Sequence, residues 1–332
     1  MLMSEPSVPL LVVDDLAVVF ATASGDIHAV DGVSFAIAPG EIFCMVGESG
    51  CGKSASALSI PRLLPSPPAR RLRGRVLFDG LDLALCPEGR LESIRGSRIG
   101  MVFQEPMTSL NPVFRVGEQI AEVLLRHKEV TRDAAHEAAV RLLGEVGIPD
   151  PASRVFDFPH QMSGGMRQRV MIAMALACEP QLLIADEPTT ALDVTVQRQV
   201  LSLLRGLTRE KAHALLLITH NLRIVADMAD HVAVMYCGKI VESAPARELF
   251  ANPLHPYTLG LMRSHPDIDP GSRFTRLPVI PGAVPNPLRR PSGCAFRDRC
   301  GQAHARCREM PPLYALPHGH ECRCWLREGA GS

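Results

Sequence analysis

The chain has 332 residues, 46% of them hydrophobic and 21% charged, and its 35 basic and 35 acidic side chains cancel. Such a composition is ordinary for a packed globular protein, and the balanced charge gives no reason to expect nucleic acid as a partner. The longest apolar run, Val170–Cys178, has nine residues, well short of a membrane-spanning helix. Since no basic start precedes an apolar core, we expect a cytosolic chain that reaches a membrane only through a partner.

The first part of the chain predicts strands, a loop and helices in turn. Residues 11–38 alternate as in a hairpin that turns at Gly25-Asp26. Glu41–Val46 is a short apolar run that enters a glycine-rich loop. A helix is expected from Lys53 until the prolines of Pro61–Pro68 end it. Two strand-like pieces and a stretch of helical periodicity follow, at 74–80, 98–103 and 116–147.

Helix and strand signals alternate through the second part of the chain. A helix is expected from Ser163 to Cys178, a strand at 182–185, a helix from Asp193, a strand at 214–219 and a helix from Asn221. This alternation predicts a parallel sheet covered by helices, which a helical subdomain at about 105–180 interrupts. Beyond about residue 252 prolines recur, so we expect a linker and a small loop-rich appendage instead of more parallel sheet.

A phosphate-binding loop is predicted between the first apolar strand and the helix that follows it. GESGCGKS fits the pattern G-x-x-x-x-G-K-[ST], in which backbone N–H groups point at phosphates. Lys53 is expected to reach the terminal phosphates, and the Ser54 hydroxyl to bind Mg²⁺. A chance glycine-rich turn is the alternative, but strand, loop and helix are in register. The predicted nucleotide-binding residues of the loop are Gly47, Glu48, Ser49, Gly50, Cys51, Gly52, Lys53 and Ser54.

Three further segments carry polar side chains where catalysis by a nucleotide-binding protein needs them. Asp186 and Glu187 end an apolar strand, where they fit a Mg²⁺ partner and the base for an attacking water, or simply a helix cap. His220 ends another strand and is either structural or a contact to the γ-phosphate. Ser163-Gly164-Gly165 opens a helix and offers a second anion-binding surface. A single phosphate loop does not need this surface unless it serves a different nucleotide.

Over residues 11–250 the sequence resembles the ABC ATPase family. The motifs are Walker A at GESGCGKS, the Q-loop at Gln104, the signature MSGGM, Walker B with a catalytic glutamate in LLIADE, the D-loop ALD ending at Asp193, and the H-loop THN. Met162 and Met166 replace the commoner Leu and Gln of the signature, but the Ser-Gly-Gly core is kept.

The resemblance implies a RecA-like P-loop core of class α/β, with an antiparallel β subdomain and a helical subdomain. It implies hydrolysis of ATP with Mg²⁺ held by Ser54, Gln104 and Asp186, and catalysis by Lys53, Gln104, Glu187 and His220. Two domains are expected to close head to tail, so that each ATP lies between one Walker A and the other domain's Ser163, Gly164 and Gly165. Phe20 is expected to stack on adenine, although a core phenylalanine is an alternative.

Longer stretches narrow the resemblance to the ATPase subunits of oligopeptide and dipeptide permeases, with their nickel-importing relatives. The stretches are FPHQMSGGMRQRV, LHPYT and PGAVP. This implies an ATPase domain at 11–255, a permease-type C-terminal domain at 256–328, and a peripheral position on the cytoplasmic face of the cell membrane. The implied partners are a second, homologous ATPase subunit, two transmembrane permease subunits and an extracytoplasmic binding protein. A nickel or other small-solute importer, or a soluble ABC ATPase that moves no solute, is the alternative.

Half of the ten cysteines crowd the last 40 residues: Cys294, Cys300, Cys307, Cys322 and Cys324. In a reducing compartment such a group favours a metal site over disulfides. The permease resemblance implies a [4Fe–4S] cluster on four of them, and a cysteine four residues after a histidine selects Cys324, after His320, with Cys322 in reserve. A zinc knuckle or free thiols remain alternatives. The arginines around these cysteines form a solvated face, offset thiolate charge or meet a partner.

Overall fold

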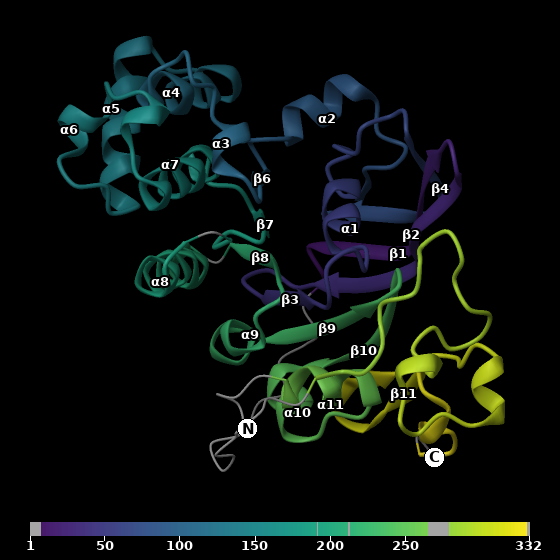
Figure 1. Ribbon diagram of the computed structural model, residues 1–332. Helices are drawn as coiled ribbons and strands as arrows, with labels where there is room; N and C mark the ends of the chain where they lie inside the picture. The colour runs from purple at the N-terminus through teal and green to yellow at the C-terminus, as the bar shows by residue number, and fades with distance from the viewer. Residues whose placement is uncertain (1–7, 191, 212, 265–278, 331–332) are drawn as a thin grey trace. The chain divides into compact units, whose positions relative to one another are not determined.

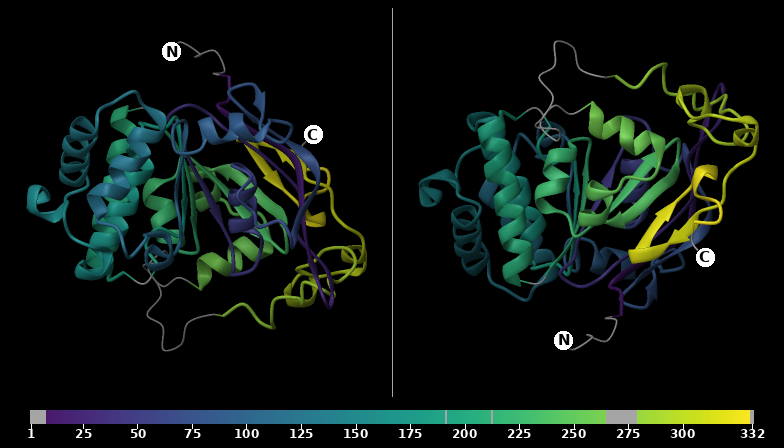
Figure 2. Two further views of the ribbon diagram at one scale, coloured as in Figure 1. Left: turned by 90° about the horizontal axis from the view of Figure 1, so that it is seen from above. Right: turned by 90° about the horizontal axis from the view of Figure 1, so that it is seen from below.

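The computed structural model of the protein describes residues 8–190, 192–211, 213–264 and 279–330 (Figures 1 and 2). The chain forms two compact units, and it passes between them several times. Of the described residues, the first unit holds 8–10, 38–41 and those within 85–218, and the second holds 11–37, 42–84 and those within 219–264 and 279–330. The predicted domain limits, 11–255 and 256–328, stay predictions.

The first unit is built on a parallel sheet whose strands run in the order β6-β7-β8. These are β6 (Ile99–Val102), β7 (Leu182–Asp186) and β8 (Ala214–Thr219). Every residue of β7 and β8 is buried. Strands of a parallel sheet that are covered on both faces read as continuous apolar runs, which is why these two segments were predictable. The predicted parallel sheet is therefore confirmed here.

Most of the helices belong to the first unit, and α3 to α7 gather as one group in Figure 1. Predicted as one helical stretch, 116–147 divides into α4 and α5, because the chain is extended at Lys128. Ser163 begins α7 by accepting a hydrogen bond from the N–H of Met166. The bounds are α2 (Glu88–Ile94), α3 (Pro106–Ser109), α4 (Val116–His127), α5 (Arg132–Glu145), α6 (Pro151–Arg154), the 3-10 turn η1 (Pro159–Gln161), α7 (Gly164–Leu176) and α8 (Val194–Lys211).

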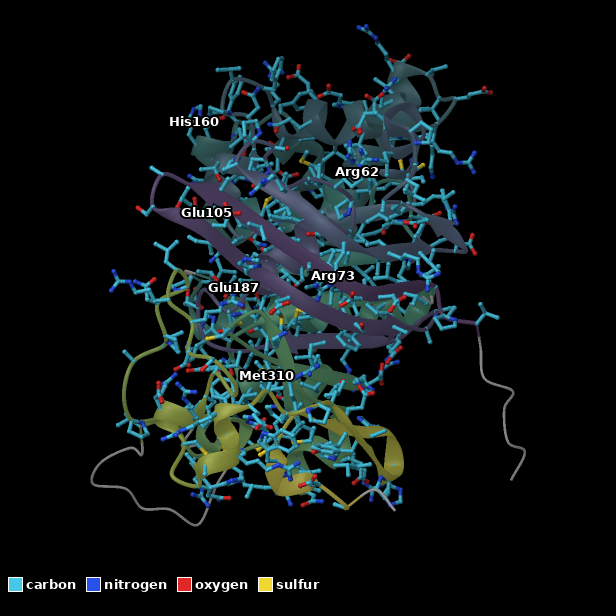
Figure 3. All side chains as sticks on the ribbon, turned by 90° about the vertical axis from the view of Figure 1, so that its right-hand side faces the viewer. Arg62, Arg73, Glu105, His160, Glu187 and Met310 are labelled. Atoms are coloured by element: carbon cyan, nitrogen blue, oxygen red, sulfur yellow. The ribbon has the colours of Figure 1, made fainter. Side chains whose placement is uncertain are left out.

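The second unit contains an antiparallel sheet in the order β2-β1-β4-β5. Its strands are β1 (Leu11–Thr22), β2 (Gly25–Ile37), β4 (Ala69–Phe78) and β5 (Leu81–Asp82). The predicted hairpin is confirmed, but its turn falls at residues 23 and 24, because Thr22 already pairs with Gly25. Charged pairs line the exposed face of the sheet, including Arg73 on β4 with Asp15, and Figure 3 labels Arg73 there.

A second set of strands in this unit mixes both directions. β3 (Ile42–Val46) is parallel to β9 (His231–Tyr236), and β9 pairs antiparallel with β10 (Lys239–Pro245). The C-terminal strands continue the sheet: β12 (His320–Cys322) pairs antiparallel with β10, and β11 (Tyr314–Leu316) pairs antiparallel with β12. Figure 2 shows β11 and β12 as yellow arrows side by side. The helices of the unit are α1 (Lys53–Ser59), α9 (Leu222–Met228), α10 (Ala246–Ala251) and α11 (Pro256–Arg263).

Residues 279–330 are loop-rich, as expected, and contain four short 3-10 turns. These are η2 (Arg297–Arg299), η3 (Ala305–Arg308), η4 (Pro317–Gly319) and η5 (Trp325–Arg327). Several of the arginines are used within the second unit: Arg299 binds Glu48, Arg306 binds Glu328 and lies 4.0 Å from the Trp325 ring, and Arg327 binds the Leu254 carbonyl. The arginine excess is thus explained in part by contacts inside the chain.

Candidate functional site

The phosphate loop lies in the second unit, between β3 and α1, and two of its glycines cannot be replaced without strain. A Cβ on Gly47 would lie 2.3 Å from the Met235 carbonyl oxygen, and one on Gly52 would lie 2.3 Å from that of Ala29. Both glycines also have positive φ, 152° and 109°. Only glycine combines such backbone angles with such close approach. The loop is therefore shaped by the strands on either side of it.

Lys53 curls back over the loop that precedes it. Its Nζ donates to the carbonyl oxygens of Gly47 at 2.8 Å and Glu48 at 3.1 Å, and the residue is 5% exposed. Cys51 is also buried, and its carbonyl accepts a hydrogen bond from the N–H of Gly238 at 2.8 Å. Burial raises the pKa of the Cys51 thiol. The loop thus holds its lysine beside backbone groups that a phosphate would approach.

In the first unit the structure brings Gln104 and Glu187 together. They follow β6 and β7, which are parallel neighbours, so both side chains emerge from the same edge of the sheet. The Gln104 Nε2 donates to Glu187 Oε2 at 3.3 Å, and the Thr190 hydroxyl donates to the same oxygen at 3.0 Å. Glu187 has a positive φ of 45° and is labelled in Figure 3. The sequence did not predict the Thr190 contact, because no motif used above marks Thr190 as a site residue.

Three more predicted site residues lie at or next to the ends of strands and helices, and their roles stay predictions: Asp186, Ser54 and His220. Asp186 is the last residue of β7 and is 5% exposed, Ser54 is the second residue of α1, and His220 is exposed just after β8. Ser54, Gln104 and Asp186 offer hydroxyl, amide and carboxylate oxygens, the hard donors that Mg²⁺ prefers. By their chemistry these three residues fit the predicted ion.

The signature segment, also in the first unit, is presented differently from the phosphate loop. Ser163 and Gly164 are exposed, and the Ser163 hydroxyl oxygen accepts a hydrogen bond from the Met166 N–H of its own helix. Gly165 is needed for packing, because a Cβ there would lie 2.5 Å from Val196 Cγ1. The segment therefore opens α7 toward solvent, as an anion-binding helix start would.

Two other predicted site residues lie outside these groups. Asp193 caps α8, since its Oδ1 accepts from the N–H groups of Thr195 at 3.0 Å and Val196 at 2.9 Å. Ala191, at the start of the predicted D-loop, is outside the described residues. Phe20 lies on β1, paired with Ile27, and is partly exposed, so it is not part of the closed core.

The C-terminal cysteines are free thiols, and Cys300, Cys307 and Cys324 lie near Cys294. Burial, together with the nearby Cys307, Cys324 and Cys300 thiolates, raises the pKa of Cys294 to about 11. Burial, the Glu242 carboxylate and the nearby Cys324 raise the pKa of Cys322, which pairs with Glu242 across β12 and β10. Across the described ranges, no three His, Cys, Asp or Glu side chains come together as ligands of one metal ion. The four thiols are thus neighbours, but they are not arranged as the closed ligand set of a single ion.

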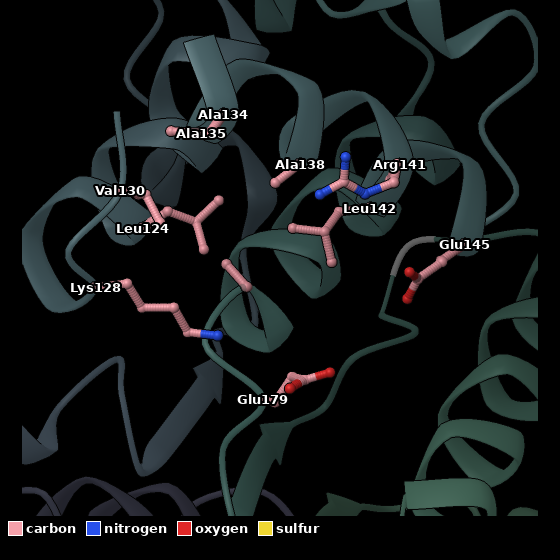
Figure 4. Close-up of a pocket in the computed structure, with 11 residues that line it drawn as sticks. Leu124, Lys128, Val130, Ala134, Ala135, Ala138, Arg141, Leu142, Glu145 and Glu179 are labelled. Carbon is pink, nitrogen blue, oxygen red and sulfur yellow. The ribbon is translucent and has the colours of Figure 1, made fainter. Parts of the chain in front are cut away.

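One cavity of the first unit lies away from every predicted site residue. It has a volume of about 320 Å³, between α4, α5 and the end of α7, and its rim carries Lys128, Arg141 and Glu179 (Figure 4). Of the helices within the described residues, none has both the length and the apolar character that crossing a bilayer requires.

Comparisons with known proteins agree with the geometry of these segments. Residues 30–190 match the family described as ABC transporter, and residues 241–307 match the oligopeptide/dipeptide transporter C-terminal region. The chain is 48% identical to the oligopeptide transport ATP-binding protein OppD of Bacillus subtilis, over 96% of this chain and 88% of the relative. It is 51% identical to a probable peptide ABC transporter ATP-binding protein of Sinorhizobium fredii, over 97% of this chain and 96% of the relative.

Solved structures give the same result for the fold. The dimeric post-hydrolysis state of the ATP-binding cassette MJ0796, bound to ADP and Pi, matches with a TM-score of 0.65 and 25% identity, over 71% of this chain and 99% of that chain. A second dimeric structure of MJ0796, described as a bacterial ABC transporter cassette, matches with a TM-score of 0.64 and 26% identity, over the same shares. The phosphate loop, the Gln104–Glu187 pair and the outward-facing signature are therefore parts of an ATP-hydrolysing cassette, and the chain belongs to the ABC transporter family.

Proposed function

We propose that the chain is the ATP-hydrolysing subunit that powers an importer of oligopeptides or dipeptides. The observation that carries this is the joint match of a cassette at 30–190 and an oligopeptide/dipeptide transporter C-terminal region at 241–307. Relatives named for peptide transport are similar over nearly the full length of both chains, which supports the same role for the whole chain.

Within the ATP site, Gly47–Ser54 cradles the phosphates and Lys53 neutralises the charge of the terminal phosphates. Ser54, Gln104 and Asp186 would hold Mg²⁺, which would supply further charge stabilisation. Glu187 orients the attacking water and accepts its proton, while Gln104 and Thr190 hold the carboxylate in place at 3.3 and 3.0 Å. His220 contacts the γ-phosphate, and Phe20 stacks on the adenine. Positioning and charge stabilisation account for the catalysis.

The signature segment completes the site of another subunit. The exposure of Ser163 and Gly164 supports this, as does the dimeric state named for the MJ0796 structures. In a head-to-tail dimer Ser163, Gly164 and Gly165 contact the partner's nucleotide, and Asp193 lies at the interface. The second subunit is a homologous ATPase. Two transmembrane permease subunits and an extracytoplasmic binding protein complete the importer, so the chain lies peripherally on the cytoplasmic face of the cell membrane.

Reconstitution of the importer tests this function. The full chain, its partner ATPase, the permease subunits and the binding protein are placed in proteoliposomes, and ATP hydrolysis and uptake of labelled peptides are measured together. We expect peptide with its binding protein to stimulate hydrolysis and uptake. Stimulation by Ni²⁺ or another small solute in place of peptide would favour the alternative importer. Full hydrolysis by the chain without a permease would favour a cassette that moves no solute.

For the C-terminal cysteines we propose a [4Fe–4S] cluster held by Cys294, Cys300, Cys307 and Cys324. The proximity of Cys300, Cys307 and Cys324 to Cys294 supports the set. The place of Cys322 on β12, opposite Glu242 of β10, supports leaving it out. Four thiolates are the ligands that such clusters use, and a cluster spans more space than one ion. It would join three separate turns of the C-terminal segment and so stabilise it.

Anaerobic purification tests the cluster. Iron, acid-labile sulfide and the visible charge-transfer absorbance are measured for the wild-type chain, Cys324→Ser and Cys322→Ser. We expect the first substitution to remove the cluster and the second to leave it. A colourless, iron-free wild-type chain would contradict the proposal, and zinc in its place would favour the knuckle.

A further inference from the structure

The second residue of the phosphate loop is held by the C-terminal segment. Arg299 Nη1 donates to Glu48 Oε2 at 2.6 Å, and Nη2 donates to Oε1 at 3.0 Å. Two parallel N–H···O bonds between a guanidinium and a carboxylate fix orientation as well as distance. The Arg299 side chain is only 5% exposed, and that of Glu48 is 28% exposed. The pair is thus shielded from much of the solvent that weakens surface ion pairs.

The backbone of Glu48 is held from the same side of the loop. Its N–H donates to the Tyr257 hydroxyl oxygen at 2.9 Å, and Tyr257 is fully buried on α11. Burial raises the pKa of this tyrosine, so it stays a neutral hydroxyl. The carboxylate and the N–H of Glu48 therefore both have partners inside the second unit.

Arg299 is itself fixed by its surroundings. Its Nε donates to the Pro281 carbonyl at 3.0 Å, and Nη1 also reaches the Tyr236 hydroxyl at 3.3 Å. The guanidinium carbon lies 5.9 Å from the ring centres of Tyr236 and Phe296. Because these contacts restrict the side chain before it meets Glu48, little conformational entropy is lost in making the pair.

The backbone of Arg299 lies in the turn between two of the C-terminal cysteines. The η2 turn is set by hydrogen bonds from the Arg297 N–H to the Cys294 carbonyl at 3.1 Å and from the Cys300 N–H to the Arg297 carbonyl at 3.3 Å. Phe296, in the same turn, is buried against Tyr236 and Tyr257 with ring centres 5.3 Å apart in each case. The position of the guanidinium thus depends on the fold of this cysteine-bearing turn.

We propose that Arg299 is a positioning residue for ATP binding, and that the side chain of Glu48 serves the site by receiving Arg299 instead of touching the nucleotide. The inference rests on the proposed function, because it assigns a role within the ATP site. The N–H groups of a phosphate loop bind only when they converge on the phosphates, so a rotation at Glu48 displaces those that follow. The C-terminal segment thereby holds the phosphate loop in its binding shape.

A double-mutant cycle on nucleotide binding tests the pair. The Kd for Mg²⁺-ATP is measured on the full chain for wild type, Arg299→Ala, Glu48→Ala and the double variant. We expect each single change to raise Kd about tenfold and the double change to raise it no further, since both remove one interaction. Arg308→Ala is the control, because it removes an exposed arginine of the same segment and should leave Kd unchanged.

A second measurement separates loop position from general loss of structure. Site-resolved alkylation of the buried Cys51 is followed by mass spectrometry, below the unfolding temperature of every variant. We expect faster labelling in Arg299→Ala than in wild type, with ATP restoring protection. Arg299→Lys and Glu48→Gln keep most of the side-chain volume, so they should give intermediate labelling rates. These two variants serve as the test if the alanine variants do not fold.

The outcomes are distinct. Additive effects on Kd, or a wild-type Kd and Cys51 rate in the Arg299 variants, would overturn the inference while leaving the proposed function standing. A wild-type chain that binds no ATP would overturn both.

Discussion

We propose that the phosphate loop and the signature segment both bind phosphate through backbone N–H groups, and yet their surroundings within the chain are very different. The phosphate loop is enclosed: Gly47 touches β9, Gly52 touches β2, Lys53 is 5% exposed and Glu48 is clamped by Arg299. Ser163, by contrast, is exposed, and its hydroxyl oxygen caps the helix that it begins. The phosphate loop is thus shaped by contacts within its own unit, whereas the signature segment is exposed, as the proposed contact with a second chain requires.

Replacing the Glu187 carboxylate should have the largest effect of all, because it should stop ATP hydrolysis without preventing ATP binding. We expect Glu187→Gln in the assembled importer to lower ATP turnover by about 100-fold or more, because the base that accepts the proton of water is gone. Binding of ATP by the phosphate loop should persist, as measured by retained labelled nucleotide. Glu145→Gln, an exposed change on α5, is the control. Normal turnover by the Glu187 variant would show that another group is the base.

A methyl group on Gly52 should test how closely the phosphate loop is enclosed. The new Cβ would lie 2.3 Å from the Ala29 carbonyl oxygen at a φ of 109°. We expect Gly52→Ala to abolish detectable ATP binding and to lower the free energy of unfolding by about 2–3 kcal/mol. Gly206→Ala is the matched control: nothing lies within 4 Å of its Cβ, and in α8 it should stabilise by about 0.5–1 kcal/mol. Unchanged ATP affinity in the Gly52 variant would contradict this account of the loop.

Acid should lower the stability of the second unit, which contains the phosphate loop, through protonation of His255. Burial lowers the pKa of this histidine to about 4 from an ordinary 6.5, so between these values the unfolded chain binds a proton that the folded chain does not. Stability therefore falls as the pH is lowered through that window, by about 1.4 kcal/mol per pH unit for such a group.

His255→Asn checks this dependence, because asparagine keeps an acceptor for the Tyr257 N–H that His255 Nδ1 now accepts at 3.0 Å. Urea unfolding at several pH values should show a shallower slope for this variant, although His231, with a pKa also lowered to about 4, still contributes. His304→Asn, an exposed change, should keep the wild-type slope. An equal slope in the His255 variant would assign the effect elsewhere.

Removal of the Ser163 hydroxyl should have the smallest effect on the isolated chain and a larger effect on ATP turnover by the assembled pair. As the N-cap of α7, Ser163→Ala should lower stability by about 1 kcal/mol without changing the ATP affinity of the isolated chain. Turnover in the paired complex should fall. Thr131→Ala removes the equivalent cap of α5, where Thr131 accepts from the Ala134 N–H at 3.3 Å, and should match the stability loss with no loss of turnover. Equal turnover in both variants would count against the shared site.

Local sequence patterns predicted the parts of the fold that local physics decides. Apolar runs identified β7 and β8, and the N-cap serine with two glycines identified the start of α7. The Gln104–Glu187 contact also follows from motif order, once β6 and β7 are parallel neighbours.

Contacts between distant parts of the chain were not predictable in this way. Glu48 and Arg299 are separated by 251 residues, and neither pattern nor charge marks them as a pair. The same is true of the register of β12 on β10, where Glu242 pairs with Cys322. Such pairings depend on how remote segments pack, which no short window of sequence contains.

The short C-terminal strands affect the tendency of the protein to aggregate. β12 hydrogen-bonds the outer side of β10, and β11 beyond it has only three residues. Without them β10 would expose a row of unused N–H and C=O groups, the kind of sheet edge onto which a strand of another molecule can add. A chain truncated before Tyr314 should therefore aggregate more readily, which means that β11 and β12 also help to keep the protein in solution.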